Sequence, residues 1–337
     1  MELTFEAIAE DSPGPKWRAL FDRFWPAYER WFLSDGDSAR PRYLSSLRAL
    51  REHMPELVPT YERLVELAGN TDLIARFMSS FCPPSYLIRC SQAVWSDEAP
   101  FLVRNYDYNP QLYEGVILKT AWNGRAVISM NDCMWGVLDG INEDGLAVSL
   151  SFGGRKIVGT GFGVPLVLRY VLEFCTTTDE ATSVLERVPV HMAYNVTVLD
   201  ASGTFVTAYL RPDEPPVVRA VPYAANHQEA IEWVQHAKAT KTLERERFLC
   251  RQLYGGARTP ADMIDSFLRS PLYSSAFANG YGTLYTAVYR PVTRAAEFRW
   301  PTAEWRFDFD AFEEGKRTIA LGAPSSPVAP TTVSPHA

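Results

Sequence analysis

The chain has 337 residues, of which 47% are hydrophobic, 22% charged and 13% aromatic, a composition that is typical of a folded globular protein and excludes a disordered or collagen-like chain. Its 33 basic and 40 acidic residues give a net charge of −7, which argues against a nucleic-acid partner. The longest apolar runs fall well short of the roughly 20 residues of a membrane helix, and residues 1–6 lack the basic and apolar regions of a secretory signal, so we expect a cytoplasmic protein with no membrane partner.

The first ninety residues favour helices. Aromatic and aliphatic residues recur at spacings of three and four over 17–32, 43–50, 57–68 and 73–78. The loops between these stretches are short, and no flexible linker follows them. We therefore expect residues 1–89 to form an all-helical segment that packs on the rest of the chain.

From Cys90 onward the apolar residues follow the period of two that is typical of strands. Strands are predicted at 90–95, 101–108, 115–121, 126–131, 145–152, 194–199, 204–210, 217–224, 282–289 and 294–300. Helices are predicted at 165–175, 179–187, 229–253 and 260–268. Blocks of strands separated by blocks of helices indicate an α+β fold with helices outside two stacked sheets. We expect this domain to span 90–322, before a disordered tail at 323–337 that is rich in Pro, Ser and Thr.

Neither a metal nor a cofactor is expected. The five cysteines form no Cys-x-x-Cys pair, which argues against a disulfide framework or a zinc ribbon; they are Cys82, Cys90, Cys133, Cys175 and Cys250. No two histidines have a metal-ligand spacing, and the glycine-rich stretch at 159–163 lacks the ending of a phosphate loop. Most of the cysteines are therefore expected to be small buried residues.

The two strands that follow the helical segment are best suited to carry chemistry. Cys90 opens the first strand, and the second strand carries Arg104, Asn105 and Asp107. If the strands pair as a hairpin, alternation puts Asn105 and Asp107 on one face and Arg104 on the other. A carboxylate in a strand otherwise made of Phe, Leu, Val and Tyr needs a positively charged or hydrogen-bonding partner. By contrast, the charge run at 244–247 is expected on a solvated helix face.

Further motifs follow in order at 140–148, 163–173, Ala225-Asn226-His227 and 282–285. Together with Cys90 and the Arg104-Asn105-Tyr106-Asp107 strand, they resemble the N-terminal nucleophile (Ntn) hydrolases of the isopenicillin N acyltransferase family. These proteins are related to choloylglycine hydrolases and penicillin V acylases. The resemblance covers about residues 85–305 and begins after a helical segment of suitable length.

The resemblance implies a four-layer αββα sandwich with a helical prosegment, made as a proenzyme that cleaves itself between Arg89 and Cys90. Cys90 would be the nucleophile, and its own α-amino group, with a reference pKa of about 8, would be the general base. In the same family pattern Asp107 holds the α-ammonium, Arg104 favours the thiolate and Asn226 stabilises the oxyanion. Candidate residues of the substrate pocket are Asn105, Tyr108, Ser151 and Tyr281.

The implied activity is amide hydrolysis or acyl transfer through an acyl-thioester on Cys90, with a small-molecule acyl amide, or an ester or thioester donor, as substrate. The two chains formed by cleavage would stay associated, and a homo-oligomer remains open. Two positions depart from the family. Arg89 replaces the glycine that eases a strained N-to-S acyl shift, and Tyr281 replaces an arginine before the last pair of strands. The alternative is therefore an uncleaved Ntn-fold protein that binds a ligand without turnover.

Overall fold

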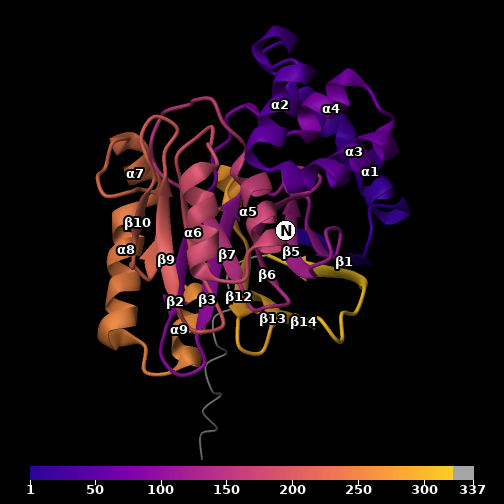
Figure 1. Cartoon of the computed structure of the whole chain (residues 1–337). Helices are drawn as coiled ribbons and strands as arrows, with labels where there is room; N and C mark the ends of the chain where they lie inside the picture. Colours follow the sequence, from indigo (N-terminus) through magenta and orange to yellow (C-terminus); the bar gives the residue numbers. More distant parts are fainter. Residues whose placement is uncertain (322–337) are drawn as a thin grey trace, which may run out of the picture.

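The computed structural model describes residues 1–321, in which two antiparallel-rich β-sheets stack face to face (Figure 1). The larger sheet has nine strands in the order β10-β9-β8-β7-β6-β5-β4-β1-β15. Its strands are β1 (Glu2–Glu10), β4 (Val116–Thr120), β5 (Val127–Asp132), β6 (Gly136–Asn142), β7 (Ala147–Phe152), β8 (Tyr194–Leu199), β9 (Phe205–Leu210), β10 (Val217–Arg219) and β15 (Gly315–Ala320). The smaller sheet has the order β11-β2-β3-β12-β13-β14. Its strands are β2 (Arg89–Trp95), β3 (Phe101–Tyr108), β11 (Tyr223–Ala224), β12 (Gly282–Arg290), β13 (Ala295–Trp300) and β14 (Ala303–Asp308).

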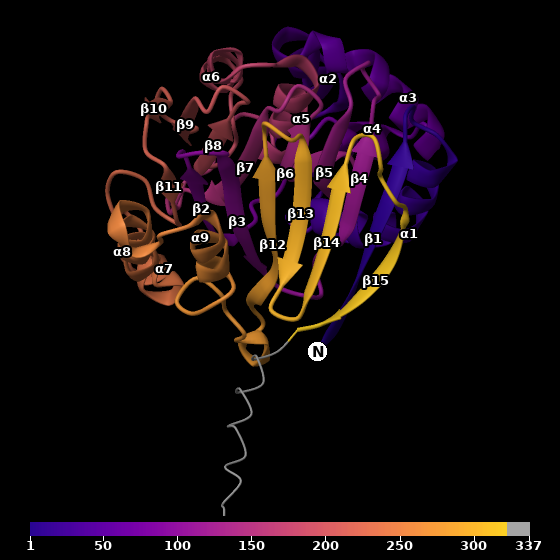
Figure 2. The same cartoon turned by 90° about the horizontal axis from the view of Figure 1, so that it is seen from below.

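Helices lie on the outer side of each sheet, and on the six-stranded sheet they cover the β11–β2–β3 end. Helices α5 (Val164–Phe174) and α6 (Thr178–Arg187) pack on the nine-stranded sheet, and α8 (Thr242–Arg251) and α9 (Pro260–Phe267) pack on the six-stranded sheet, as Figure 1 and Figure 2 show from two sides. All but the last residue of α5 are buried, as expected of a helix that other elements cover on every side. The predicted α+β fold and the four-layer αββα sandwich are therefore confirmed.

Four further helices gather beside the sandwich, coloured indigo in Figure 1. They are α1 (Pro15–Phe32), α2 (Tyr43–His53), α3 (Val58–Ala68) and α4 (Asp72–Met78). Two buried tryptophans tie these helices to the β5–β6 region: the Trp17 indole N–H donates to the Met134 carbonyl, and the Trp135 indole N–H donates to the Met78 carbonyl, each at 2.9 Å. The helical segment shares one hydrophobic core with both sheets.

The expectation that residues 1–89 are all helical was wrong for the first ten of them. Strand β1 lies inside the nine-stranded sheet, antiparallel to β15 and parallel to β4. Its Leu3, Phe5 and Ala7 alternate with polar residues, and Phe5 is fully buried against the Trp300 ring. The strands that pair with β1 begin more than a hundred residues later in the chain, so no neighbouring strand in the sequence indicated that this short alternating segment belongs to a sheet.

Other boundaries also needed correction. Strands β6, β14 and β15 were not predicted, and the expected strand at 217–224 is divided between two sheets as β10 and β11. The expected helix at 229–253 begins at α7 (Val234–Thr240) and breaks at Lys241, whose φ of 50° is left-handed. The end of the predicted domain, residue 322, and the predicted disordered tail lie outside the described residues. Within residues 1–321, no helix has both the length and the apolar character needed to cross a membrane.

Candidate functional site

The β2–β3 hairpin brings Cys90 and the polar residues of β3 together, as predicted. In the register of the two strands Cys90 faces Tyr106, Arg89 faces Asp107 and Gln92 faces Arg104. Alternation puts the Cys90 and Arg104 side chains on the face toward the nine-stranded sheet. Cys90 is fully buried there, in a strand that runs without interruption from Arg89.

The sulfur of Cys90 lies beside a buried cation. Arg104 Nη2 donates to Cys90 Sγ at 3.1 Å, and Arg104 Nη1 is paired with Asp139 of strand β6. Asp139 also accepts hydrogen bonds from the hydroxyls of Tyr285, at 2.6 Å, and Tyr289. Burial raises the pKa of the Cys90 thiol, and the charge of Arg104 opposes that rise. Arg245 opposes the rise as well, to a smaller extent, and Asp139 holds Arg104 from the other sheet.

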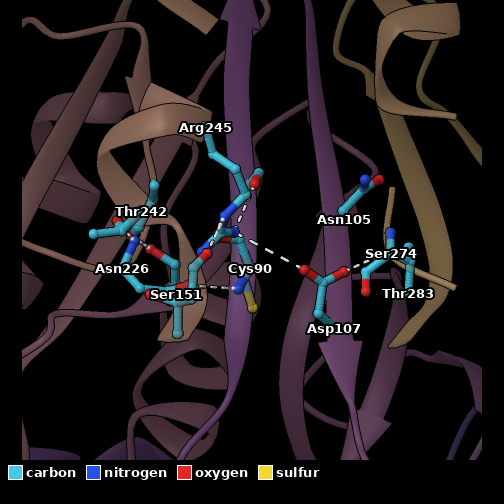
Figure 3. A network of polar contacts seen from close by, with 12 residues as sticks. Cys90, Asn105, Asp107, Ser151, Asn226, Thr242, Arg245, Ser274 and Thr283 are labelled. Carbon is cyan, nitrogen blue, oxygen red and sulfur yellow. Dashed lines mark hydrogen bonds and ion pairs between the residues drawn. The ribbon is translucent and has the colours of Figure 1, made fainter. Parts of the chain in front are cut away.

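The backbone of Cys90 is held from the other side by Asn226 and Arg245. The Cys90 N–H donates to Asn226 Oδ1 at 3.2 Å, and Arg245 Nη1 donates to the Cys90 carbonyl at 2.6 Å. Arg245 Nη2 donates to the same Asn226 Oδ1 at 2.5 Å, so the two residues fix each other. Figure 3 shows both side chains converging on the strand that carries Cys90. In this arrangement the Asn226 carbonyl faces the Cys90 nitrogen, and its Nδ2 donates to the Phe152 carbonyl at 3.3 Å.

Asp107 lies on the opposite face of β3, toward the helix layer, as alternation predicts. Its Oδ1 accepts a hydrogen bond from the Thr283 hydroxyl at 2.6 Å, and its Oδ2 lies 3.9 Å from Arg245 Nη1. Burial raises the pKa of Asp107, and the charge of Arg245 opposes that rise. In residues 1–321 no hydrogen bond joins Asp107 to Cys90 directly; Arg245 links them (Figure 3).

Two of the predicted pocket residues have structural partners instead of an open cavity. The Asn105 amide donates to the Phe267 carbonyl of α9 at 2.7 Å and accepts from Thr286 at 2.7 Å. The Ser151 hydroxyl donates to the Ala225 carbonyl at 2.7 Å and so supports the turn that carries Asn226. Both side chains are fully buried.

The other two predicted pocket residues lie near Arg89. The guanidinium of Arg89 stacks on the Tyr281 ring, 4.4 Å from its centroid. The Tyr281 hydroxyl lies 3.5 Å from the Leu87 carbonyl, and its ring meets the ring of Tyr108 edge on. Tyr108 also lines an aromatic cavity between α1 and the loops beside β4 and β5.

Sequence reasoning missed Arg245 and Asp139. Arg245 belongs to the charge run that we expected on a solvated face, yet its side chain is 4% exposed. A signal was available, because Thr242, Arg245 and Leu249 share one helix face at spacings of three and four, and all three are buried. Asp139 lies between apolar residues of β6, the same context that drew attention to Asp107.

No group of three or more His, Cys, Asp or Glu side chains in residues 1–321 is arranged to hold a metal ion. The site itself consists of a buried thiol, two buried arginines and two buried carboxylates. A thiol with a cation at its sulfur and a hydrogen-bond acceptor at its own backbone nitrogen is suited to nucleophilic attack on a carbonyl carbon.

No curated protein matches this chain. A mutant conjugated bile acid hydrolase from Clostridium perfringens is 13% identical, with 69% of this chain and 98% of that chain covered and a TM-score of 0.41. Penicillin V acylase from Agrobacterium tumefaciens is 15% identical, with 66% of this chain and 86% of that chain covered and a TM-score of 0.43. The Caenorhabditis elegans N-acylethanolamine-hydrolyzing acid amidase ortholog is 16% identical, with 69% of this chain and 100% of that chain covered and a TM-score of 0.46.

The family comparison is the informative one. Residues 94–305, well over half of the chain, match the model of the family described as acyl-coenzyme A:6-aminopenicillanic acid acyl-transferase. The matched range begins just after Cys90 and includes Arg104, Asp107, Asn226 and Arg245. The chain therefore belongs to the acyl-coenzyme A:6-aminopenicillanic acid acyl-transferase family, a family of Ntn-type amide hydrolases and acyltransferases.

Proposed function

We propose that this chain is the precursor of a cysteine Ntn amidohydrolase or acyltransferase, which cleaves its own Arg89–Cys90 bond and then works through an acyl-thioester on Cys90. One observation carries the proposal: Arg104 lies 3.1 Å from the Cys90 sulfur while Asn226 lies 3.2 Å from the Cys90 nitrogen. A structural cysteine needs neither contact. A nucleophile whose own amine is the base needs both of its atoms to be held.

Self-cleavage would begin at the thiol. The Cys90 sulfur attacks the carbonyl carbon of Arg89, the peptide C–N bond breaks, and the thiol proton passes to the departing nitrogen, which becomes the α-amine of Cys90. Water then hydrolyses the thioester and releases the Arg89 carboxylate and the Cys90 thiol. In the uncleaved chain Asn226 accepts the N–H of this nitrogen, so its predicted oxyanion role belongs to the cleaved enzyme.

Turnover would reuse the same atoms. The α-amine accepts the thiol proton, the sulfur attacks the acyl carbon of the substrate, and the substrate amine leaves with a proton. Water or a second amine then takes the acyl group from the thioester. Arg104 stabilises the thiolate in this cycle, and Arg245 keeps Asp107 and Asn226 next to the new amine.

We propose that residues 1–89 remain bound as a separate chain after cleavage, with 90–322 as the catalytic chain. The position of β1 supports this, because β1 lies between β4 and β15 with ladder hydrogen bonds on both sides. Removing the first chain would expose one edge of β4 and separate β15 from the nine-stranded sheet, which is costly. The buried bond between Trp17 and the Met134 carbonyl adds a second link.

The test is to compare the purified chain with Cys90→Ala and Cys90→Ser, using Cys250→Ala as the matched cysteine control. Denaturing mass spectrometry should find fragments of residues 1–89 and 90–337 in the unmodified chain and in Cys250→Ala. Cys90→Ala should stay intact and release no amine from acyl amides, including acylated 6-aminopenicillanic acid.

The alternative function is ligand binding without cleavage. It is favoured by Arg89, whose side chain is packed on Tyr281 where the family pattern has glycine. A chain that stays intact in every variant, binds an acyl amide and never turns it over would replace our proposal with this one.

A further inference from the structure

A second feature of the molecule is a cavity of about 220 Å³ between helix α1 and the loops beside β4 and β5. Its walls are aromatic rings, including Phe24 and Trp31 from α1 and Tyr86 and Tyr108 from the segments around Cys90. Two half-buried carboxylates, Glu114 and Asp132, also line it. The walls therefore come from both sides of the Arg89–Cys90 bond.

Within residues 1–321, every hydrogen-bond donor to these two carboxylates is neutral. Glu114 accepts from the Tyr28 hydroxyl at 2.5 Å, the Asn131 amide at 2.6 Å and the Met134 N–H at 2.9 Å. Asp132 accepts from the Cys133 thiol at 3.4 Å, and the Tyr28 hydroxyl lies 3.4 Å from its other oxygen.

Positive charge is missing from this group. No basic side chain of residues 1–321 lies within ion-pairing distance of Glu114 or Asp132, and Arg23, which acts on Glu114 from farther away, is itself paired with Glu6 at 2.8 Å. Burial raises the pKa of both carboxyl groups, and Glu114 helps to raise that of Asp132 to about 7. Half-buried carboxylates without a counter-charge are expensive to keep ionised, and an incoming cation would relieve that cost.

The chemistry of the walls narrows the choice of cation. Aromatic faces attract organic cations and bury apolar groups, whereas a hydrated metal ion gains little from them. A cavity of about 150 Å³ is large enough for benzene, so about 220 Å³ fits one ring with a short chain. We propose that this cavity binds a small organic amine as its ammonium ion, with the nitrogen at Glu114 and Asp132 and the apolar body between the aromatic rings.

The proposal does not depend on chemistry at Cys90, so it is tested in full-length Cys90→Ala, which cannot process or turn over a ligand. Titration calorimetry would compare phenethylamine with two near-isosteres, the neutral phenethyl alcohol and the anionic phenylacetate. We expect phenethylamine to bind at least about tenfold more tightly than either, as a charge-assisted hydrogen bond contributes that much. Equal binding of the three ligands, or no binding of the amine at millimolar concentration, would overturn the proposal.

Variants locate the site. Asp132→Asn and Glu114→Gln should each weaken phenethylamine binding at least about tenfold, while Asp144→Asn, which removes a carboxylate paired with Arg125 on the surface, should leave it unchanged. Thermal unfolding of each variant would show whether it is folded. If one fails to fold, the other variant and the ligand series still decide the matter. Unchanged amine binding in both folded variants would contradict the placement of the ammonium group.

Discussion

Arg245→Met is the substitution that most sharply tests how the site is held together. The Arg245 and Asp107 side chains are 4% and 7% exposed, and their charged atoms lie 3.9 Å apart. Arg245 also donates to the Cys90 carbonyl, the Ser91 hydroxyl and Asn226 Oδ1. Methionine fills similar space but supplies neither the charge nor the donors.

The expected cost follows from these contacts. Breaking a buried ion pair from one side leaves the other charge uncompensated and destabilises a protein by about 3–5 kcal/mol. Part of this cost should be recovered in the Arg245→Met/Asp107→Asn double variant, because Asp107→Asn removes the stranded charge. We expect a coupling of at least about 1 kcal/mol between the two positions. Because Asp107 can escape by taking up a proton, the loss in Arg245→Met should be larger at pH 8 than at pH 5.

The assay is urea unfolding followed by tryptophan fluorescence, in the Cys90→Ala background so that a single intact chain is measured. Arg247→Met is the matched control, since Arg247 is exposed on the same helix. A free energy of unfolding for Arg245→Met within about 1 kcal/mol of that of this control would show that Arg245 does not hold the site together, and so would simple additivity of the effects of Arg245→Met and Asp107→Asn.

Three further predictions concern the thiol, the cavity and the cleavage position. Arg104→Met should raise the pKa of the Cys90 thiol further and slow self-cleavage at least about tenfold. The pH profile of the cleavage rate should move to higher pH, and an unchanged profile would exclude a role for Arg104 at the sulfur. The pKa of Asp132 is raised to about 7 from an ordinary value of about 3.9, so the folded state binds a proton that the unfolded state has already lost, and the free energy of unfolding should fall as pH rises between these values. In urea unfolding, Asp132→Asn should show a smaller fall than the unmodified chain. An equal fall in both proteins would contradict the raised pKa. Arg89→Gly should speed cleavage, measured by mass spectrometry over time, because it removes the stacking on Tyr281 and frees the backbone; equal or slower cleavage would contradict a restraining role for Arg89.

Local patterns in the sequence were enough to predict how the candidate residues of strands β2 and β3 are placed. Strands β2 and β3 are neighbours in the chain and consist of strong strand formers, so their pairing and the faces of Arg104, Asn105 and Asp107 follow from alternation alone. The same alternation correctly separates the cation at the sulfur from the carboxylate on the helix side. The helices α5 and α6 were also predicted to within a residue or two, since their apolar patterns are long and regular.

Elements that depend on distant partners could not be predicted in this way. Strand β1 is stabilised by β15, with Glu2 opposite Ala320, and nothing near it in sequence indicates that pairing. Arg245 is buried because its helix packs against the turn at Asn226, strand β2 and Asp107. These three segments are far from Arg245 in the sequence or separate from one another, so no local pattern indicates that they meet there. The division of 217–224 between two sheets likewise arises from the stacking of the sheets, which the alternation within one strand does not encode.

Whether Cys90 is an N-terminal nucleophile can be decided by tandem mass spectrometry of the purified protein after incubation with an activated acyl ester. We expect a peptide that begins at Cys90 and carries the acyl mass. In samples quenched and digested in acid, which prevents transfer of the acyl group to the α-amine, this mass is on the sulfur and is lost on treatment with hydroxylamine. An intact chain in which Arg89 is still joined to Cys90, with no acyl group on that sulfur, would contradict this role of Cys90.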